Sequence, residues 1–140
     1  MRIKTLSLSC LFFIGCNLSD EQLNKIFSIA EDQSNKIIAQ TYIPEINYYQ
    51  EKGKKFYKRA KDYCKEAKNY SGNRKYERIM LCARYFAMAG ENYCGAGDHF
   101  LKRSLQTNNK EFLFYSKSYY SLCESSGRLS EQTALRADWI

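Results

Sequence analysis

The chain has 140 residues, a length typical of one compact domain, which excludes a multidomain enzyme. Apolar residues make up 44% of the sequence and aromatic residues 15%, so the chain carries too many core-forming side chains for a disordered protein. The formal net charge is +7, from 22 Lys and Arg against 15 Asp and Glu, and this favours an anionic partner or surface.

Residues 1–15 have the layout of a secretory signal. Arg2 and Lys4 form a basic start, and an apolar stretch follows through Ile14. A permanent transmembrane helix needs about 20 apolar residues, so this stretch is too short to remain in a bilayer. We therefore expect the leader to be removed.

The leader ends in a motif that resembles the lipobox of bacterial lipoproteins, Phe13-Ile14-Gly15-Cys16. The resemblance implies that the Cys16 thiol receives a diacylglycerol, that the leader is cut just before it, and that the new amino group is acylated. Phe13 stands where the family usually has Leu, whereas Gly before the cysteine is the common choice. Each buried methylene contributes roughly 0.8 kcal/mol, so two or three acyl chains would hold the domain on a membrane. The alternative is a secreted protein in which Cys16 joins a disulfide.

The same resemblance implies a location and an order of segments for the mature protein. Residues 16–18 would form the lipid anchor and a short tether, and residues 19–140 a single helical domain. Asn17 follows the acylated cysteine, and the absence of Asp there favours the outer membrane, at its periplasmic face or at the cell surface. Two basic residues and no acids leave with the leader, so the mature chain keeps 20 basic residues against 15 acidic ones.

Helix signals begin at Ser19, which stands three residues before Gln22 in the spacing of a capping box. We expect this helix to end near Tyr42, and a second one to run from Pro44, a good first helical residue, to Tyr70. Core candidates recur at helical spacing in both: Leu23, Ile26, Ala30 and Ile37 in the first, and Ile46, Tyr49, Gly53, Phe56, Ala60, Tyr63, Ala67 and Tyr70 in the second.

This second seam recurs thirty residues later with the same steps and the same small positions. Its members are Tyr76, Ile79, Ala83, Phe86, Gly90, Tyr93, Gly97 and Phe100. The segment Ser71-Gly72-Asn73 between the two seams is a turn signal. Small residues let two antiparallel backbones approach closely, but Gly inside a helix loses roughly 1 kcal/mol relative to Ala. We therefore expect Gly95 and Gly97 to kink or end the third helix near Asp98.

A last helix is expected from Lys110 to Ser125, with Gly127 closing it. Its inward residues would be Phe112, Tyr115, Tyr119 and Leu122. Residues 129–140 would form a short amphipathic tail whose Trp139 packs back on the bundle.

No segment alternates with period two for long enough to be a strand. The predicted fold is all-α, an up-down bundle of about four helices that contains a duplicated antiparallel hairpin. The thirty-residue period also allows a short stack of helical repeats, although two and a half units are few for such a stack.

Four cysteines remain once Cys10 leaves with the leader and Cys16 is acylated. They are Cys64, Cys82, Cys94 and Cys123. Outside the cytoplasm they suggest two disulfides, whereas the lack of any CxxC or Cys-His cluster argues against a zinc site.

The hairpin turns favour one pairing of these cysteines. The midpoint of Cys64 and Cys82 falls in the first predicted turn, and that of Cys94 and Cys123 in the turn at residues 108–109. Residues equally far from a hairpin turn lie opposite each other. A Cys82–Cys94 bond would instead span about 18 Å along one helix, beyond disulfide reach. We therefore predict that two disulfides staple the bundle, each across one hairpin.

Catalytic chemistry has little support in the sequence. The single histidine, His99, lies beside Asp98, and no nucleophile triad, phosphate loop, HExxH or paired-carboxylate motif is present. We expect no enzymatic activity, no cofactor and no metal.

Six cations fall within ten residues of the second helix, where they could form a binding face. They are Lys52, Lys54, Lys55, Lys58, Arg59 and Lys61, of which Lys54, Lys58 and Lys61 share one side. Such a strip suits anionic lipid headgroups, a glycosaminoglycan or an acidic protein, and the alternative is a solvated face. Nucleic acid is not expected, because a lipoprotein is kept away from the cytoplasmic pool. Tyr48, Tyr57 and Tyr120 fall off the seams and are expected to be exposed.

The lipobox, the Lys- and Asn-rich composition and a small helical domain together look like the surface lipoproteins of spirochaetes. That resemblance implies a membrane-anchored, non-catalytic binding module for a host, vector or envelope component. The alternative is a periplasmic assembly lipoprotein of the secretion-pilotin type or a toxin-immunity lipoprotein.

Overall fold

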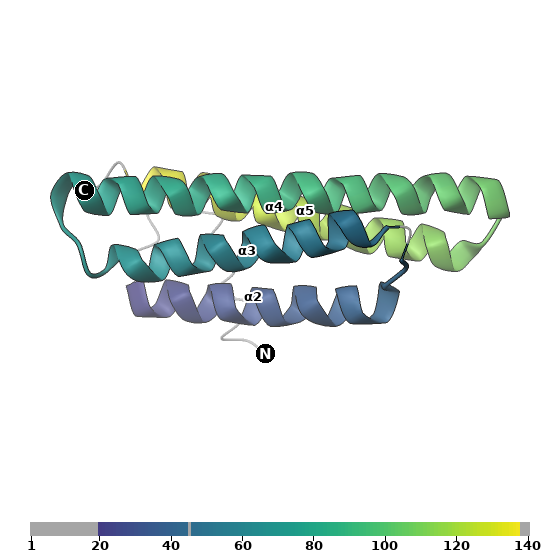
Figure 1. The fold of residues 1–140 in the computed structure, drawn as a ribbon, viewed down its shortest axis with the longest axis horizontal. Helices are drawn as coiled ribbons and strands as arrows, with labels where there is room; N and C mark the ends of the chain where they lie inside the picture. The colour runs from purple at the N-terminus through teal and green to yellow at the C-terminus, as the bar shows by residue number, and fades with distance from the viewer. Residues whose placement is uncertain (1–19, 45, 138–140) are drawn as a thin grey trace.

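Four antiparallel helices make up most of the part of the chain that the computed structural model describes, residues 20–44 and 46–137 (Figure 1). They are α2 (Asp20–Thr41), α3 (Asn47–Ala67), α4 (Gly72–Thr107) and α5 (Lys110–Ala137). No strand occurs in those residues, so the prediction of an all-α up-down bundle is confirmed. The leader, Cys16, Ser19 and Trp139 lie outside the described residues, as does the side chain of Leu23.

The helices differ in length and in how much they pack together. Helix α4 packs extensively against both α5 and α3, whereas α2 packs mainly on α3. In Figure 1, α3 lies between α2 and α4, and the α4–α5 hairpin extends past the ends of α2 and α3. Helix α2 still reaches the common core, since the Phe27 ring lies 4.9 Å from that of Phe86 in α4.

Helix α3 begins at Asn47, so the prediction that Pro44 is its first residue was wrong. The Ile46 amide donates to the Ile43 carbonyl at 2.9 Å and closes a turn across Pro44. The helix therefore begins only after this turn, which also buries Ile46 to 2% exposure. The helix ends at Ala67 rather than at Tyr70.

The fully buried side of α3 is rotated from the predicted seam toward α2. Ile46 and Ala60 are buried as expected, but Tyr49 and Phe56 are only half-buried. Gln50 and Tyr57 take their place in the core, at 0% and 2% exposure, so the expectation that Tyr57 is exposed was wrong. The reason is that α2 covers a second side of α3, and a helix between two neighbours buries a wider stripe than one seam.

The predicted seam of α4 is confirmed over most of its length, since Ile79, Ala83, Phe86, Tyr93 and Phe100 are all buried. Tyr76 is 42% exposed, contrary to prediction. The Cys64–Cys82 bond sets a register in which position 76 faces position 70. Because α3 has already ended at Ala67, no helical neighbour from α3 covers Tyr76.

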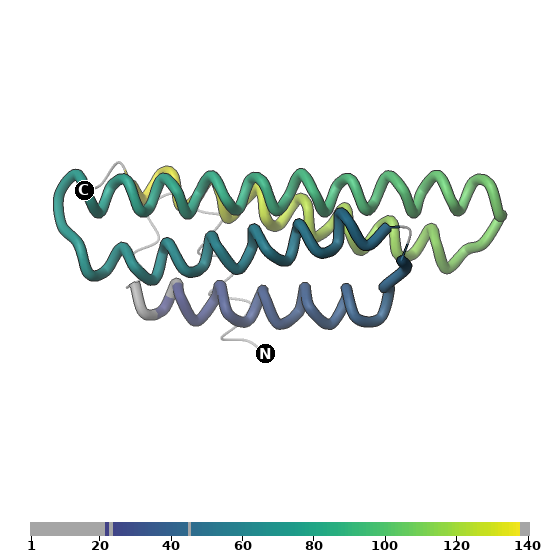
Figure 2. The backbone as a smooth tube through the Cα atoms, viewed as in Figure 1, coloured from purple at the N-terminus to yellow at the C-terminus, as the bar shows by residue number. Residues whose placement is uncertain are grey.

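Helix α4 passes its glycines without a break, so the expected kink or end near Asp98 was wrong (Figure 2). Gly90, Gly95 and Gly97 each lie against a neighbouring helix. A Cβ at Gly90 would meet the Cys123 carbonyl oxygen at 3.1 Å, and one at Gly95 would lie 2.5 Å from the ring of Tyr49. The packing that these close approaches allow offsets the roughly 1 kcal/mol that each helical glycine loses. The helix ends instead at Asn108, which has a left-handed φ of 55°.

Helix α5 likewise continues through Gly127 to Ala137, so Gly127 does not close it and residues 129–137 are not a separate tail. Leu129, Thr133 and Ala137 are buried at helical spacing against the bundle. This extra length packs along the first half of α4, which supplies the contacts that a free tail would lack.

Candidate functional site

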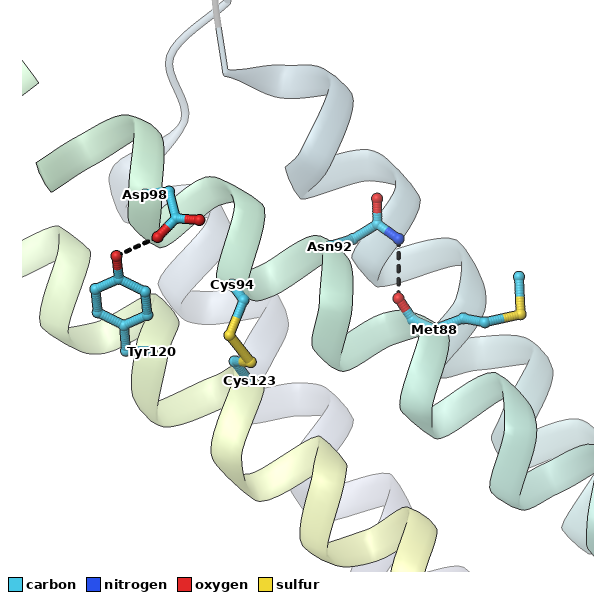
Figure 3. The surroundings of a disulfide bond; sticks show 6 residues. All are labelled: Met88, Asn92, Cys94, Asp98, Tyr120 and Cys123. Carbon is cyan, nitrogen blue, oxygen red and sulfur yellow. Dashed lines mark hydrogen bonds between the residues drawn. A yellow bond between two sulfur atoms is a disulfide. The ribbon is translucent and has the colours of Figure 1, made fainter. Parts of the chain in front are cut away.

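Both predicted disulfides are present and hold α4 to its neighbours. Cys64 is bonded to Cys82 with a Cα–Cα distance of 5.3 Å, and Cys94 to Cys123 with one of 5.2 Å. Figure 3 shows the second bond joining α4 to α5. These four thiols are therefore unavailable as nucleophiles or metal ligands.

Close to the second disulfide, α4 and α5 are also joined by a hydrogen bond. The Tyr120 hydroxyl donates to the Asp98 carboxylate, and this bond raises the pKa of the phenol (Figure 3). The Tyr120 ring covers the backbone at Gly97, where a Cβ would lie 3.0 Å away, so the residue is half-buried rather than exposed. His99 is exposed, and its ring lies 5.0 Å from that of Tyr49. The Asp98 carboxylate is thus engaged by Tyr120, and the His99 ring lies against Tyr49.

Three tyrosine hydroxyls lie deep in the bundle. Burial raises the pKa of Tyr57, Tyr93 and Tyr119 above the ordinary phenol value. Tyr119 receives a hydrogen bond from the Gln50 amide at 2.7 Å and shares another with the Thr41 hydroxyl at 2.7 Å. These fully enclosed groups join α2, α3 and α5 and are out of reach of a substrate.

A hollow beside the first disulfide is too small to bind a substrate. It has a volume of about 20 Å³, enough for roughly one water molecule. Its lining includes Phe27, Cys64, Ile79 and Thr133. Within the described residues, no three His, Cys, Asp or Glu side chains come together in a way that could hold a metal ion.

The six predicted cations lie together on α3 but fall into different environments. Lys54, Lys55 and Lys58 are exposed. Lys61 forms an ion pair with Glu31 of α2, and its side chain is only 24% exposed. Lys61 therefore belongs to the α2–α3 contact and not to a free basic face.

The remaining two cations, Lys52 and Arg59, lie over aromatic rings along the α3–α4 seam. The Lys52 ammonium is 5.4 Å from the ring centre of Tyr48 and 5.7 Å from that of Phe56. The Arg59 guanidinium lies 5.5 Å from the ring centre of Tyr85 in α4 and donates to its hydroxyl at 3.3 Å. Tyr48 itself is 60% exposed, as predicted.

Helix α4 contributes a third cation to this seam, one that the sequence did not single out. The Arg78 guanidinium lies 5.9 Å from the ring centre of Tyr63 and 5.3 Å from that of Tyr70. We call the whole set the cation–aromatic row: Tyr48, Lys52, Phe56, Arg59, Tyr63, Tyr70, Arg78 and Tyr85. The three- and four-residue spacing of its α3 members was visible in the sequence, but the pairing with Arg78 and Tyr85 depends on how α4 packs.

None of the described helices is both long and apolar enough to span a bilayer. No protein-family model matches the chain, and neither a curated protein nor a solved structure matches it.

Proposed function

We propose that this protein is a membrane-anchored lipoprotein whose helical domain is a non-catalytic binding module for an anionic host, vector or envelope component. The leader and its Gly15-Cys16 junction support the anchor. Enzymatic activity is not part of the proposal, because the four cysteines of the domain are bonded in pairs and Asp98 is engaged by Tyr120.

The observation that carries the proposal is the charge on α3. This helix has seven Lys and Arg against three Asp and Glu, a net charge of +4 over 21 residues. Lys54, Lys55 and Lys58 project into solvent from it. The Cys64–Cys82 bond fixes the helix to α4, so the positive face is held on a rigid support. Exposed cations on a rigid helix attract anions through a field that salt screens, with a Debye length of about 8 Å at physiological ionic strength.

The proposed binding of an anionic component is tested with a protein of residues 16–140 that carries Cys16→Ser. One variant replaces Lys54, Lys55 and Lys58 by Glu. Binding to a panel of anionic vesicles, a sulfated polysaccharide and an acidic protein is measured at increasing salt. We expect the variant to bind the parent's preferred ligand at least about ten-fold more weakly, since three exposed pairs contribute roughly 0.5 kcal/mol each before repulsion is added.

A matched control makes the same change in net charge elsewhere. Lys102, Lys110 and Lys117 are exposed near the α4–α5 turn, away from α3, and are replaced together by Glu. The control should keep most of the parent's binding. Equal loss in both variants, or no binding by the parent to any ligand of the panel, would contradict a specific role for the α3 face.

The anchor is tested in cells. Labelled fatty acid should enter the parent protein but not the Cys16→Ser variant, and persistent labelling of that variant would exclude Cys16 as the site. Protease treatment of intact cells then separates a surface binder, which is cleaved, from a periplasmic assembly or immunity lipoprotein, which is protected.

A further inference from the structure

The cation–aromatic row orders three cations in a line. Lys52 and Arg59 are seven residues apart on α3, which is two helical turns and roughly 10 Å along the same side. Arg78 reaches the level of Glu66, since its Nε lies 3.6 Å from that carboxylate, and Glu66 is seven residues beyond Arg59. The three cations therefore follow one another at nearly equal intervals.

Aromatic rings hold each of these cations in place. Lys52 lies over the rings of Tyr48 and Phe56, and Arg78 over two tyrosine rings. A cation that rests on a ring loses less side-chain freedom when an anion binds it, so the row is organised before its partner arrives. In this respect it differs from Lys54, Lys55 and Lys58, which extend into solvent.

The ring faces are largely used within the protein. Tyr63 and Tyr85 stack on each other with ring centres 5.4 Å apart. Arg59 lies over Tyr85, and Arg78 over Tyr63. The row consequently offers one well-exposed ring, that of Tyr48, rather than the succession of open rings on which the bases of a single-stranded nucleic acid stack.

The exposed side of α3 is also poorly suited to packing against a partner helix. Among the described residues of α3, Tyr48 is the one large apolar side chain that is mostly exposed. A helix that docks on another helix needs an apolar stripe to bury, and this face presents mainly charged side chains. The row therefore fits a hydrophilic partner with negative charge spaced along its length.

We propose that the cation–aromatic row binds a linear anionic polysaccharide, sulfated or carboxylated, laid along the α3–α4 seam. The interval between its cations is comparable to the length of a disaccharide, so one charged group per repeat can meet each cation in turn. Lys54, Lys55 and Lys58 then add a less ordered electrostatic attraction from the exposed surface of α3. This inference rests on the proposed binding function and adds its site and its ligand class.

Charge-preserving variants test the row, because they leave the overall field unchanged. Phe56→Leu removes a ring beneath Lys52, and Arg59→Lys and Arg78→Lys keep the charge but lose the planar guanidinium. Affinity for immobilised heparin at physiological salt should fall about two- to five-fold for each variant. Phe114→Leu is the control, since this 66% exposed ring lies on α5 outside the row. It should leave the affinity unchanged.

One variant should strengthen binding. The Glu66 carboxylate competes with an incoming anion for Arg78, so Glu66→Gln should raise the affinity for heparin. Circular dichroism and the melting temperature establish that each variant is folded. Heparin binding that is insensitive to the three substitutions in the row and to Glu66→Gln would overturn the assignment of the site.

Two comparison ligands test the ligand class. Polyglutamate and single-stranded DNA, matched to heparin in number of charges, should bind more weakly and without sensitivity to Phe56→Leu. Tighter, ring-dependent binding of either one would overturn the polysaccharide assignment. If heparin does not bind, but another anionic ligand binds through Lys54, Lys55 and Lys58, this inference fails while the proposed function stands.

Discussion

The substitution Gly53→Ala tests whether the close packing of α3 against α4 requires a residue without a side chain at position 53. A Cβ at position 53 would lie 2.5 Å from Cε1 and 2.7 Å from Cδ1 of Tyr93. Carbon atoms in contact are ordinarily about 3.5–4.0 Å apart, so Gly53→Ala requires a shift of about 1 Å. The Tyr93 ring is fully buried in the common core and cannot swing into solvent.

The expected change in the free energy of unfolding for Gly53→Ala is the sum of two opposing contributions. Overpacking in a closed core costs about 1–3 kcal/mol, and the complete burial of Tyr93 favours the upper part of that range. Alanine recovers about 1 kcal/mol as a better helix former than glycine. Gly53→Ala should therefore lower the free energy of unfolding by about 1–2 kcal/mol.

Gly127→Ala is the matched control, because it changes the same atoms in the middle of α5, where no atom of a neighbouring helix lies within 4 Å of the new Cβ. Only the helix-propensity term remains, so this variant should be more stable than the parent by up to about 1 kcal/mol. The two variants should differ by about 2–3 kcal/mol, which is roughly 10 °C in melting temperature for a domain of this size.

The assay is thermal and urea unfolding of residues 16–140 with Cys16→Ser, followed by circular dichroism with both disulfides intact. Adding Tyr93→Leu to Gly53→Ala should give a favourable coupling energy, because the smaller side chain makes room for the new methyl group. If Gly53→Ala stabilised the protein as much as Gly127→Ala does, the close approach at Gly53 would not be required by packing.

Three further predictions follow from the core and its cross-links. Reducing both disulfides should lower the melting temperature strongly, since loops closed over 18 and 29 residues contribute about 3 kcal/mol each in the chain-entropy model; an unchanged melting curve after complete reduction would contradict this. Lys61→Glu should loosen α2 by opposing Glu31, seen as faster hydrogen exchange in α2 than in the parent, whereas Lys58→Glu should leave that exchange unchanged. Burial raises the pKa of Tyr57 and Tyr93, so at these two phenols the unfolded chain binds fewer protons than the folded one above about pH 10. Their contribution to the free energy of unfolding should therefore be constant below that pH and fall above it. Ultraviolet titration should show these phenols ionising only on unfolding. Their ionisation in the folded protein near the ordinary phenol pKa would refute the claim that burial raises the pKa of Tyr57 and Tyr93.

The features predicted correctly from the sequence are those that depend on local periodicity. A helix turns by a constant angle per residue, so Ile79, Phe86, Tyr93 and Phe100 were placed on one buried side of α4 without knowledge of its partner. The cysteine pairing followed in the same way, because two helices joined by a short turn have a register set by distance from that turn. The prediction held even though the ends of several helices were misplaced.

The features that were missed depend on contacts between helices that are distant in sequence. A spacing rule cannot show that α2 covers a second side of α3, and this contact is what buries Gln50 and Tyr57. Gly90, Gly95 and Gly97 do not interrupt α4, because the α5 backbone approaches Gly90 and Gly97 and the Tyr49 ring of α3 packs on Gly95. An isolated helix has no such neighbours. For the same reason, the sequence predicted one basic strip from six neighbouring cations. In the bundle, Lys61 forms an ion pair with Glu31, whereas Lys52 and Arg59 lie over aromatic rings. Helical periodicity fixes which side of a helix a residue occupies, but packing decides what lies opposite that side, because the packing energy is shared among all four helices.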